Sequence, residues 1–149
     1  MRPGIALYGG SPFDEDDPRL KPVAALRTPI LQVRTIKPGE TVGYSASKAF
    51  DAPTRLATLM LGYGDGFPRS GSNKGHVVIK GQRAPIVGRV SMDMISLDIT
   101  KLSDEVHAGD EAEFFGPNHS LFEAAMACGT LPYEMLTSLG GRIQRRYHA

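Results

Sequence analysis

Two short, turn-rich runs place side chains that could take part in chemistry next to predicted strand ends. Tyr63 lies in the run 62–69, and Asp93 lies in the run 88–94. Residues 56–61 form an apolar stretch of strand length, and the glycines that follow permit backbone angles that other residues avoid. A strand is therefore expected to end here and to present the Tyr63 phenol in a tight turn. An ordinary tight loop between two strands would give the same spacing.

The second run belongs to a stretch in which the alternation of apolar side chains changes face. Val90, Met92 and Met94 fall on one face and Asp93 on the other, and from Ile95 onward the apolar phase is shifted. Such a change predicts a β-bulge or a sharp twist near Met94. Bulges are frequent beside active sites, so Met92 and Asp93 are candidate site residues. Solvated charge on an edge strand explains Asp93 equally well.

The middle of the chain has the pattern of a small all-β structure. Short apolar stretches alternate with turn residues from residue 24 to residue 115. Pro38 followed by Gly39 suits a type II turn, and Gly81 lies in the short loop of a predicted hairpin. We therefore predict a mainly β fold that forms a closed or partly open small β-barrel, with a sandwich as the related alternative.

Helical signals appear only near the C-terminus, where one or two short helices are expected. Ser120 followed by Glu123 matches a capping box, and Gly129 suits the end of that helix. Pro132 suits the first turn of a second helix. The basic tail beyond it, from Arg142, could touch phosphate, but pairing with carboxylates elsewhere in the protein is the simpler interpretation.

Composition limits the classes of partner. The formal net charge is +1, which gives no overall field to attract nucleic acid or an anionic membrane surface, and no apolar run approaches the ~20 residues that span a bilayer. The single cysteine, Cys128, excludes an intrachain disulfide, so a reducing, cytoplasmic location is expected. His76, His107, His119 and His148 fall at no metal-ligand spacing, so no metal is expected.

Five short motifs, in this order along the chain, resemble the C-terminal third of alanine racemase. They are RPGIALYG at 2–9, VGY at 42–44, GYGDGFPR at 62–69, APIVGRVSMD at 84–93, and PYE with the later GR within 132–142. The resemblance implies a pyridoxal-phosphate-dependent isomerase with an N-terminal (β/α)8 barrel, which carries the cofactor on a lysine, and a mostly β C-terminal domain. Because such a barrel typically needs about 250 residues, the chain resembles the C-terminal domain with the last part of the barrel attached.

The resemblance also implies a division of the chain. Residues 1–22, which include a run of acidic residues followed by proline, would be a remnant of the barrel end plus a linker. Residues 23–149 would be the β domain. Without the barrel and its lysine, this chain by itself is expected to be inactive.

Four residues are implied to bind the cofactor. Arg2 matches an arginine that bonds the pyridine nitrogen, and since a guanidinium does not give up its proton, that nitrogen would stay unprotonated. Gly4 and Ile5 match backbone amides that hold the phosphate, and Tyr133 matches a tyrosine whose hydroxyl also reaches the phosphate.

The remaining implied roles concern the small amino-acid substrate. Racemisation removes the α-proton from one face and returns it to the other, so two opposed bases are needed. Tyr44 matches the catalytic tyrosine, which opposes the cofactor lysine. Met92 matches a residue whose backbone amide binds the substrate carboxylate, with Asp93 beside it, and Tyr63 matches part of the narrow entry to the site.

The implied function is the interconversion of L- and D-alanine, with D-alanine feeding cell-wall peptidoglycan. The implied partners are the barrel domain of the same enzyme and a second subunit in a homodimer. Two interpretations without catalysis also remain open. The chain could be a small β-barrel that binds RNA, with the basic tail and tyrosines as contacts, or a dimerisation module.

Overall fold

The structure is a computed structural model that describes residues 4–43, 46–103 and 105–147. Two predicted site residues, Arg2 and Tyr44, lie outside these described ranges. The strands are β1 (Leu26–Ile36), β2 (Thr41–Val42), β3 (Lys48–Ala49), β4 (Thr54–Leu59), β5 (His76–Ile79), β6 (Gln82–Val87), β7 (Ile95–Asp98) and β8 (Glu111–Phe115). The helices are α1 (Leu121–Cys128) and α2 (Pro132–Thr137), with short 3-10 helices η1 (Gly4–Tyr8), η3 (Tyr63–Asp65) and η4 (Arg69–Gly71).

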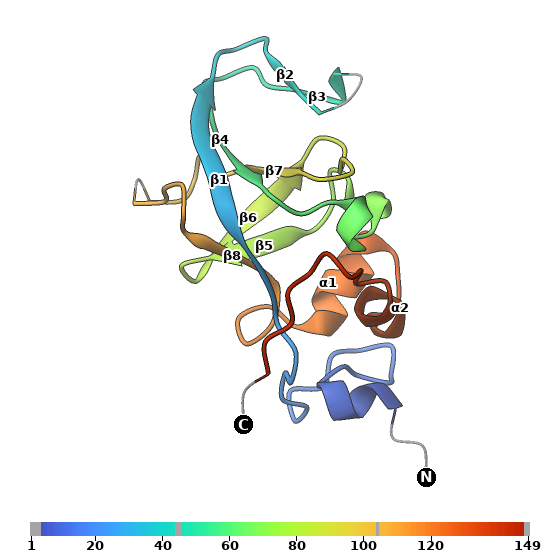
Figure 1. Cartoon of the computed structure of the whole chain (residues 1–149). Coiled ribbons are helices and arrows are strands. Elements are labelled where there is room, and N and C mark those ends of the chain that lie inside the picture. The colour runs from blue at the N-terminus through green and yellow to red at the C-terminus, as the bar shows by residue number, and fades with distance from the viewer. Residues whose placement is uncertain (1–3, 44–45, 104, 148–149) are drawn as a thin grey trace.

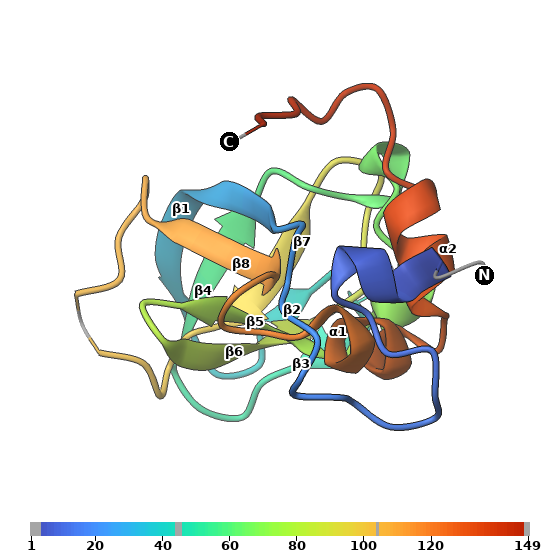
Figure 2. The ribbon, with the colours of Figure 1, turned by 90° about the horizontal axis from the view of Figure 1, so that it is seen from below.

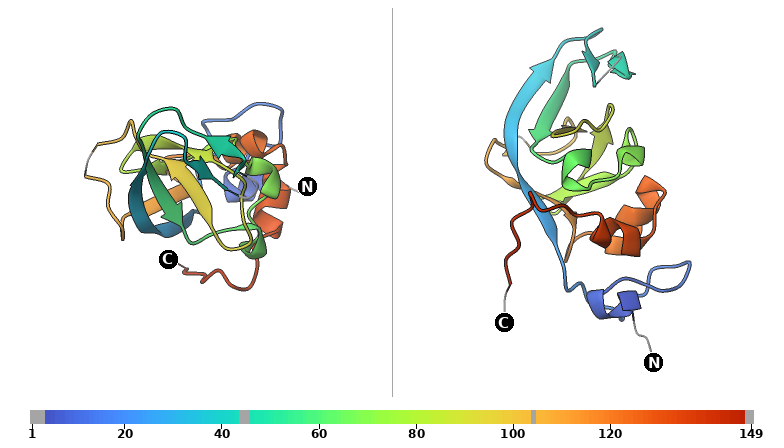
Figure 3. Two further views of the ribbon diagram at one scale, coloured as in Figure 1. Left: turned by 90° about the horizontal axis from the view of Figure 1, so that it is seen from above. Right: turned by 45° about the vertical axis from the view of Figure 1, so that its right-hand side comes forward.

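The main sheet closes into an antiparallel barrel in the order β1-β4-β7-β6-β5-β8 (Figure 1). The long β1 closes it, because residues 26–29 pair with β8 and residues 30–36 pair with β4. Its register shifts between Ile30 and Gln32, where the strand passes from one neighbour to the other. β2 and β3 form a separate hairpin at the far end of the curved β1 (Figure 3). The predicted mainly β barrel with short C-terminal helices is confirmed.

Two turn predictions are confirmed by the backbone. Gly39 has φ +84, and the Glu40 amide donates to the Lys37 carbonyl at 3.2 Å, as a type II turn requires. Lys80 and Gly81 have φ values of +48 and +77 between the paired strands β5 and β6. Two consecutive residues with positive φ are typical of the type I′ hairpin turn, which matches the twist of the strands.

The phase change in the run 88–94 has a different cause from the predicted bulge. β6 ends at Val87 and β7 begins at Ile95, and the pairing between these strands has no register shift. Ser91 and Met94 close the intervening turn, since the Ser91 amide donates to the Met94 carbonyl at 3.0 Å and the Met94 amide donates to Ser91 Oγ at 2.9 Å. The prediction of a bulge near Met94 is therefore wrong, because the chain leaves the sheet between β6 and β7.

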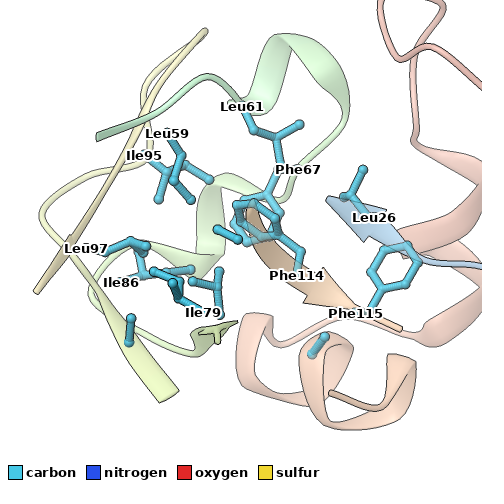
Figure 4. Packing of buried hydrophobic residues seen from close by; sticks show 14 of the residues in the cluster. Leu26, Leu59, Leu61, Phe67, Ile79, Ile86, Ile95, Leu97, Phe114 and Phe115 are labelled. Carbon is cyan, nitrogen blue, oxygen red and sulfur yellow. The ribbon is translucent and has the colours of Figure 1, made fainter. Parts of the chain in front are cut away.

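The hydrophobic core fills the barrel and continues towards the helices (Figure 4). Phe114 of β8 lies near its centre and meets Phe67 edge-on, with ring centroids 5.0 Å apart. Phe67 is the buried aromatic residue of the run 62–69, so this loop is anchored in the core. The barrel interior is completed by the buried side chains Leu59, Ile79, Ile86, Ile95 and Leu97.

The helices and the N-terminal segment lie together at one side of the barrel (Figure 2). Ser120 Oγ accepts the Glu123 amide at 3.0 Å and begins α1, and Gly129 ends it in the left-handed conformation. Ile5 of η1 is only 1% exposed and belongs to the same core as Met135 of α2. The segment that the resemblance places before the domain therefore packs against it.

Gly66 provides a test of how α2 holds the run 62–69. It has φ +104, and a Cβ there would overlap the Ser138 carbonyl just after α2. We expect Gly66→Ala to lower the free energy of unfolding by at least about 3 kcal/mol, because strain and a backbone clash combine. Gly109→Ala is the matched control, since Gly109 has φ +96 and nothing within 4 Å of a Cβ.

The control should cost only about 1–2 kcal/mol, which is the penalty for a Cβ in the left-handed region. Urea unfolding followed by circular dichroism measures both values. Equal losses in the two variants would show that the contact with Ser138 does not hold the loop.

Candidate functional site

The runs 62–69 and 88–94 lie side by side and are joined through their backbones. The Tyr63 amide donates to the Ser91 carbonyl at 3.0 Å, and the Gly64 amide donates to the Met92 carbonyl at 2.8 Å. A Cβ at residue 62 would overlap the Met92 carbonyl, so only glycine allows this approach. Tyr63 and Met92 are thereby placed on neighbouring loops, and their side chains are about half exposed, at 47% and 51%.

The loop after η4 holds the second run from the other side. The Gly88 amide donates to Asn73 Oδ1 at 2.7 Å, and the Asn73 amide donates back to the Gly88 carbonyl at 3.1 Å. Ser72 Oγ accepts the Val90 amide at 3.0 Å. Because the run 62–69 leads directly into these residues, one continuous segment of chain fixes residues 88–92 at several points.

The described residues on either side of Tyr44 also contact the second run. Gly43 has φ +83, and a Cβ there would lie 2.7 Å from the Arg89 amide nitrogen. Ser47 Oγ accepts that amide at 3.1 Å. The loop that contains Tyr44 is therefore anchored at both ends beside Arg89, although Tyr44 itself lies outside the described residues.

Arg142 binds both loops through two carboxylates. Its Nε lies 2.9 Å from Asp65 Oδ1, and its Nη1 donates to Asp93 Oδ1 at 2.8 Å. Asp65 Oδ2 in turn accepts the Gly62 amide at 2.9 Å. The hydrogen bond to Asp93, followed by the charge of Asp65, raises the pKa of the Arg142 guanidinium. This network uses the Asp93 carboxylate for positioning.

The backbone amide of Met92 is a candidate donor to an anion. Within residues 4–43, 46–103 and 105–147, its amide donates no hydrogen bond, while the neighbouring Ser91 closes the turn with Met94. Met92 as a whole is 51% exposed, and an amide without a partner in such a turn can donate to a carboxylate without first breaking another hydrogen bond.

The second group of predicted residues lies where η1 meets α2. The Ile5 amide donates to the Tyr133 hydroxyl at 3.2 Å. Gly4 has φ +53, and a Cβ there would lie 2.6 Å from the same hydroxyl oxygen. A backbone amide and a phenol thus converge beside a residue without a side chain. Both groups can donate hydrogen bonds, so the set fits a phosphate such as that of pyridoxal phosphate once the Ile5 amide exchanges its hydrogen bond to Tyr133 for one to the phosphate.

The predicted site residues therefore form two groups. Tyr63, Met92 and Asp93 lie on the paired loops, and Gly4 and Ile5 lie with Tyr133 at the start of α2. α2 connects the groups, because Ser138 at its end donates from Oγ to the Gly66 carbonyl at 2.8 Å.

Sequence reasoning missed the role of Asp65 and the double pairing of Arg142. For Arg142, the pairing of the basic tail with carboxylates is confirmed. The sequence offers one sign that Asp65 has a structural role, namely its position between Gly64 and Gly66. That pattern by itself predicts only a turn. Neither pairing could be assigned without the fold, because the residues come from distant parts of the chain.

This domain belongs to the class of closed antiparallel β-barrels. It carries three anchored loops at one end and a short helix pair at its side. The family model described as "Alanine racemase, C-terminal domain" matches residues 23–147. The chain belongs to this family. In the part of the chain that the structure describes, no helix is long and apolar enough to cross a membrane.

Comparison with relatives of known sequence and structure supports the same family assignment. The chain is 47% identical to the alanine racemase of Stutzerimonas stutzeri over 99% of its own length and 42% of that protein. It superposes on the biosynthetic alanine racemase of Pseudomonas aeruginosa with a TM-score of 0.92 and 41% identity, over 98% of this chain and 41% of that one. It also superposes on an alanine racemase of Bartonella henselae that has covalently bound pyridoxal phosphate. The TM-score is 0.91 and the identity 43%, over 97% of this chain and 40% of that one. The chain thus spans about two fifths of these relatives.

Arg142→Gln tests whether the guanidinium holds the two loops together. Its side chain is about half exposed, so we expect global stability to fall by less than about 1 kcal/mol. Amide hydrogen exchange at residues 62–64 should nevertheless accelerate about tenfold, since local opening becomes easier. Arg34→Gln, which removes an exposed arginine from β1, should change neither quantity. Equal exchange rates in the two variants would contradict the assigned role of Arg142.

Proposed function

We propose that this chain is the C-terminal domain of a pyridoxal-phosphate-dependent racemase that interconverts L- and D-alanine in the cytoplasm and supplies D-alanine for peptidoglycan. The observation that carries the proposal is the family match over residues 23–147, together with relatives named alanine racemase that align with 99% of the chain. We further propose that residues 23–149 form the β domain and that residues 1–22 come from the end of the barrel and the linker.

Residues at the start of η1 and α2 hold the cofactor in this proposal. The Ile5 amide and the Tyr133 hydroxyl, 3.2 Å apart, bind the phosphate, and Gly4 permits this approach because a Cβ there would lie 2.6 Å from the hydroxyl oxygen. Arg2 bonds the pyridine nitrogen and keeps it unprotonated. When bound, pyridoxal phosphate withdraws electrons from the substrate's α-carbon and so makes the α-proton more acidic.

Tyr44 moves the α-proton at one face of the substrate. An ordinary phenol has a pKa of about 10, so its surroundings in the complete enzyme must favour the phenolate. The open Met92 amide donates to the substrate carboxylate, and Tyr63 narrows the entry. Asp93, through Arg142, keeps the Met92 loop in register with the Tyr63 loop.

The two groups of site residues suggest an enzyme whose active sites lie between subunits. We propose a homodimer in which Arg2, Gly4, Ile5 and Tyr133 serve the cofactor of their own barrel, whereas Tyr44, Tyr63 and Met92 reach the barrel of the partner. The support for this arrangement is that the groups lie at opposite ends of α2.

A fusion tests the function directly. The chain alone, mixed with pyridoxal phosphate and L-alanine, should form no D-alanine above the background of the free cofactor. Joined to the barrel of the Pseudomonas aeruginosa enzyme, cut where the two sequences begin to align, it should racemise L-alanine. Chiral chromatography measures both. A Tyr44→Phe fusion should lose at least about 100-fold in rate, because one base is missing.

Three results would contradict the proposal. The first is turnover by the isolated chain. The second is a folded fusion that binds pyridoxal phosphate but does not racemise alanine. The third is full activity of the Tyr44→Phe fusion, which would show that this residue is not the base.

Mixed dimers test the sharing of residues between subunits. One inactive fusion lacks the cofactor lysine, and the other carries Tyr44→Ala. Refolded together, they should recover about a quarter of the activity of the unmodified fusion. Half of randomly paired dimers are mixed, and each mixed dimer has one intact site of two. If Tyr44 acted within its own subunit, every site would lack a base, and verified mixed dimers would stay inactive.

A further inference from the structure

Two histidines from distant parts of the chain stack on each other beside α1. His76 begins β5, and His119 pairs with Gly116 just before α1. Their ring centroids are 4.1 Å apart, with 29° between the planes. No role in the proposed racemisation is assigned to either ring.

Three of the four ring nitrogens of this pair are buried without a hydrogen-bond partner among the described residues. His119 is only 3% exposed, and both of its ring nitrogens are buried without a hydrogen-bond partner among the described residues, as is Nε2 of His76. Burial, followed by the neighbouring His76, lowers the pKa of His119 to about 4, and the charge of Glu123 acts in the opposite direction. Buried polar groups without partners are rare in folded proteins and call for an explanation, such as a bound water or ion.

Glu123 brings a carboxylate to the same place. It lies in the first turn of α1, with Oε2 4.0 Å from His119 Nε2. One potential ligand atom from each of His76, His119 and Glu123 can be chosen so that all lie within 4.8 Å of one another. Glu123 is exposed and His76 is half-buried, so the cluster is open to solvent on one side.

We propose that His76, His119 and Glu123 form a binding site for a divalent transition-metal ion of the zinc class. Two imidazoles and one carboxylate are a ligand set that zinc accepts, with metal–ligand distances of about 2.0–2.2 Å. Ligand atoms around such an ion are about 3–3.5 Å apart, so the three ligand atoms must close by roughly an ångström. The stacked rings must also move apart and turn, so that their nitrogen lone pairs converge on the ion. Water completes the coordination on the open side.

The ligand types decide between classes of ion. Calcium and magnesium prefer oxygen ligands, and this cluster offers only one carboxylate. Imidazole nitrogen favours zinc, nickel, copper and cobalt. The bound ion would tie the start of β5 to the start of α1, and would therefore stiffen the helix pair that carries Tyr133.

Arg83 competes for the same carboxylate. Its Nη2 lies 3.4 Å from Glu123 Oε2, and both side chains are substantially exposed. A metal ion would have to displace this guanidinium or share the carboxylate with it, and the two cations repel. Removing Arg83 should therefore strengthen metal binding, whereas removing a ligand should weaken it. Nonspecific binding at the surface would not produce these opposite effects.

Titration calorimetry with zinc chloride, on the tag-free chain and the barrel fusion after treatment with EDTA, tests the site. One equivalent should bind, and zinc should raise the melting temperature until EDTA is added. His76→Gln and Glu123→Gln should each weaken binding at least tenfold, while His107→Gln, which removes an exposed histidine elsewhere, should leave it unchanged. Arg83→Gln should tighten it several-fold. The ligand variants replace the half-buried His76 and the exposed Glu123, so they disturb the fold less than a change at the buried His119 would.

Absence of stoichiometric binding in both proteins would overturn the proposal and leave the histidines as a buried stacked pair. Equal weakening by His76→Gln and His107→Gln would overturn it as well, since the zinc would then bind to histidines nonspecifically. Cobalt provides a second readout, because its visible absorption in the wild-type protein should disappear in His76→Gln.

Discussion

The backbone contact between residues 62–64 and residues 91–92 determines where the candidate substrate-binding groups lie. Two amide–carbonyl hydrogen bonds join these loops, and Gly62 is required because any side chain there would overlap the Met92 carbonyl. The core supports the contact through Phe67, and Asn73 supports it from the opposite side. Because the loops cannot shift independently, the exposed Tyr63 side chain and the open Met92 amide keep one relative position.

The short α2 transmits this constraint to the candidate cofactor site. Its first turn carries Tyr133 against the Ile5 amide, and just after its last turn Ser138 bonds to Gly66. Arg142, a few residues later, binds Asp65 and Asp93. In the proposed dimer, this rigid link would hold a subunit's own cofactor at a set distance from the groups it offers to its partner, which is the geometry that preorganised catalysis needs.

The local features of the fold were predicted because their causes are local. Gly39 and Gly81 have the positive φ values that their turns require, and Ser120 begins the helix that its side chain was expected to cap. The predicted bulge near Met94 failed for a related reason. A phase change in apolar alternation arises from a bulge or from a chain that leaves the sheet, and only the hydrogen bonds between Ser91 and Met94 distinguish the two.

The sequence alone was sufficient for the strand pattern, the turns, the helix start and the motifs that resemble alanine racemase, because each depends on residues close together in the chain. The tertiary structure decided which distant residues meet. Arg142 and Asp93 are 49 residues apart and pair only because α2 brings the tail back to the loops. His76 and His119 fall at no metal-ligand spacing, yet barrel closure and the start of α1 stack them against each other. Such contacts follow from how β5, β8 and α1 pack, which no local pattern of side chains specifies.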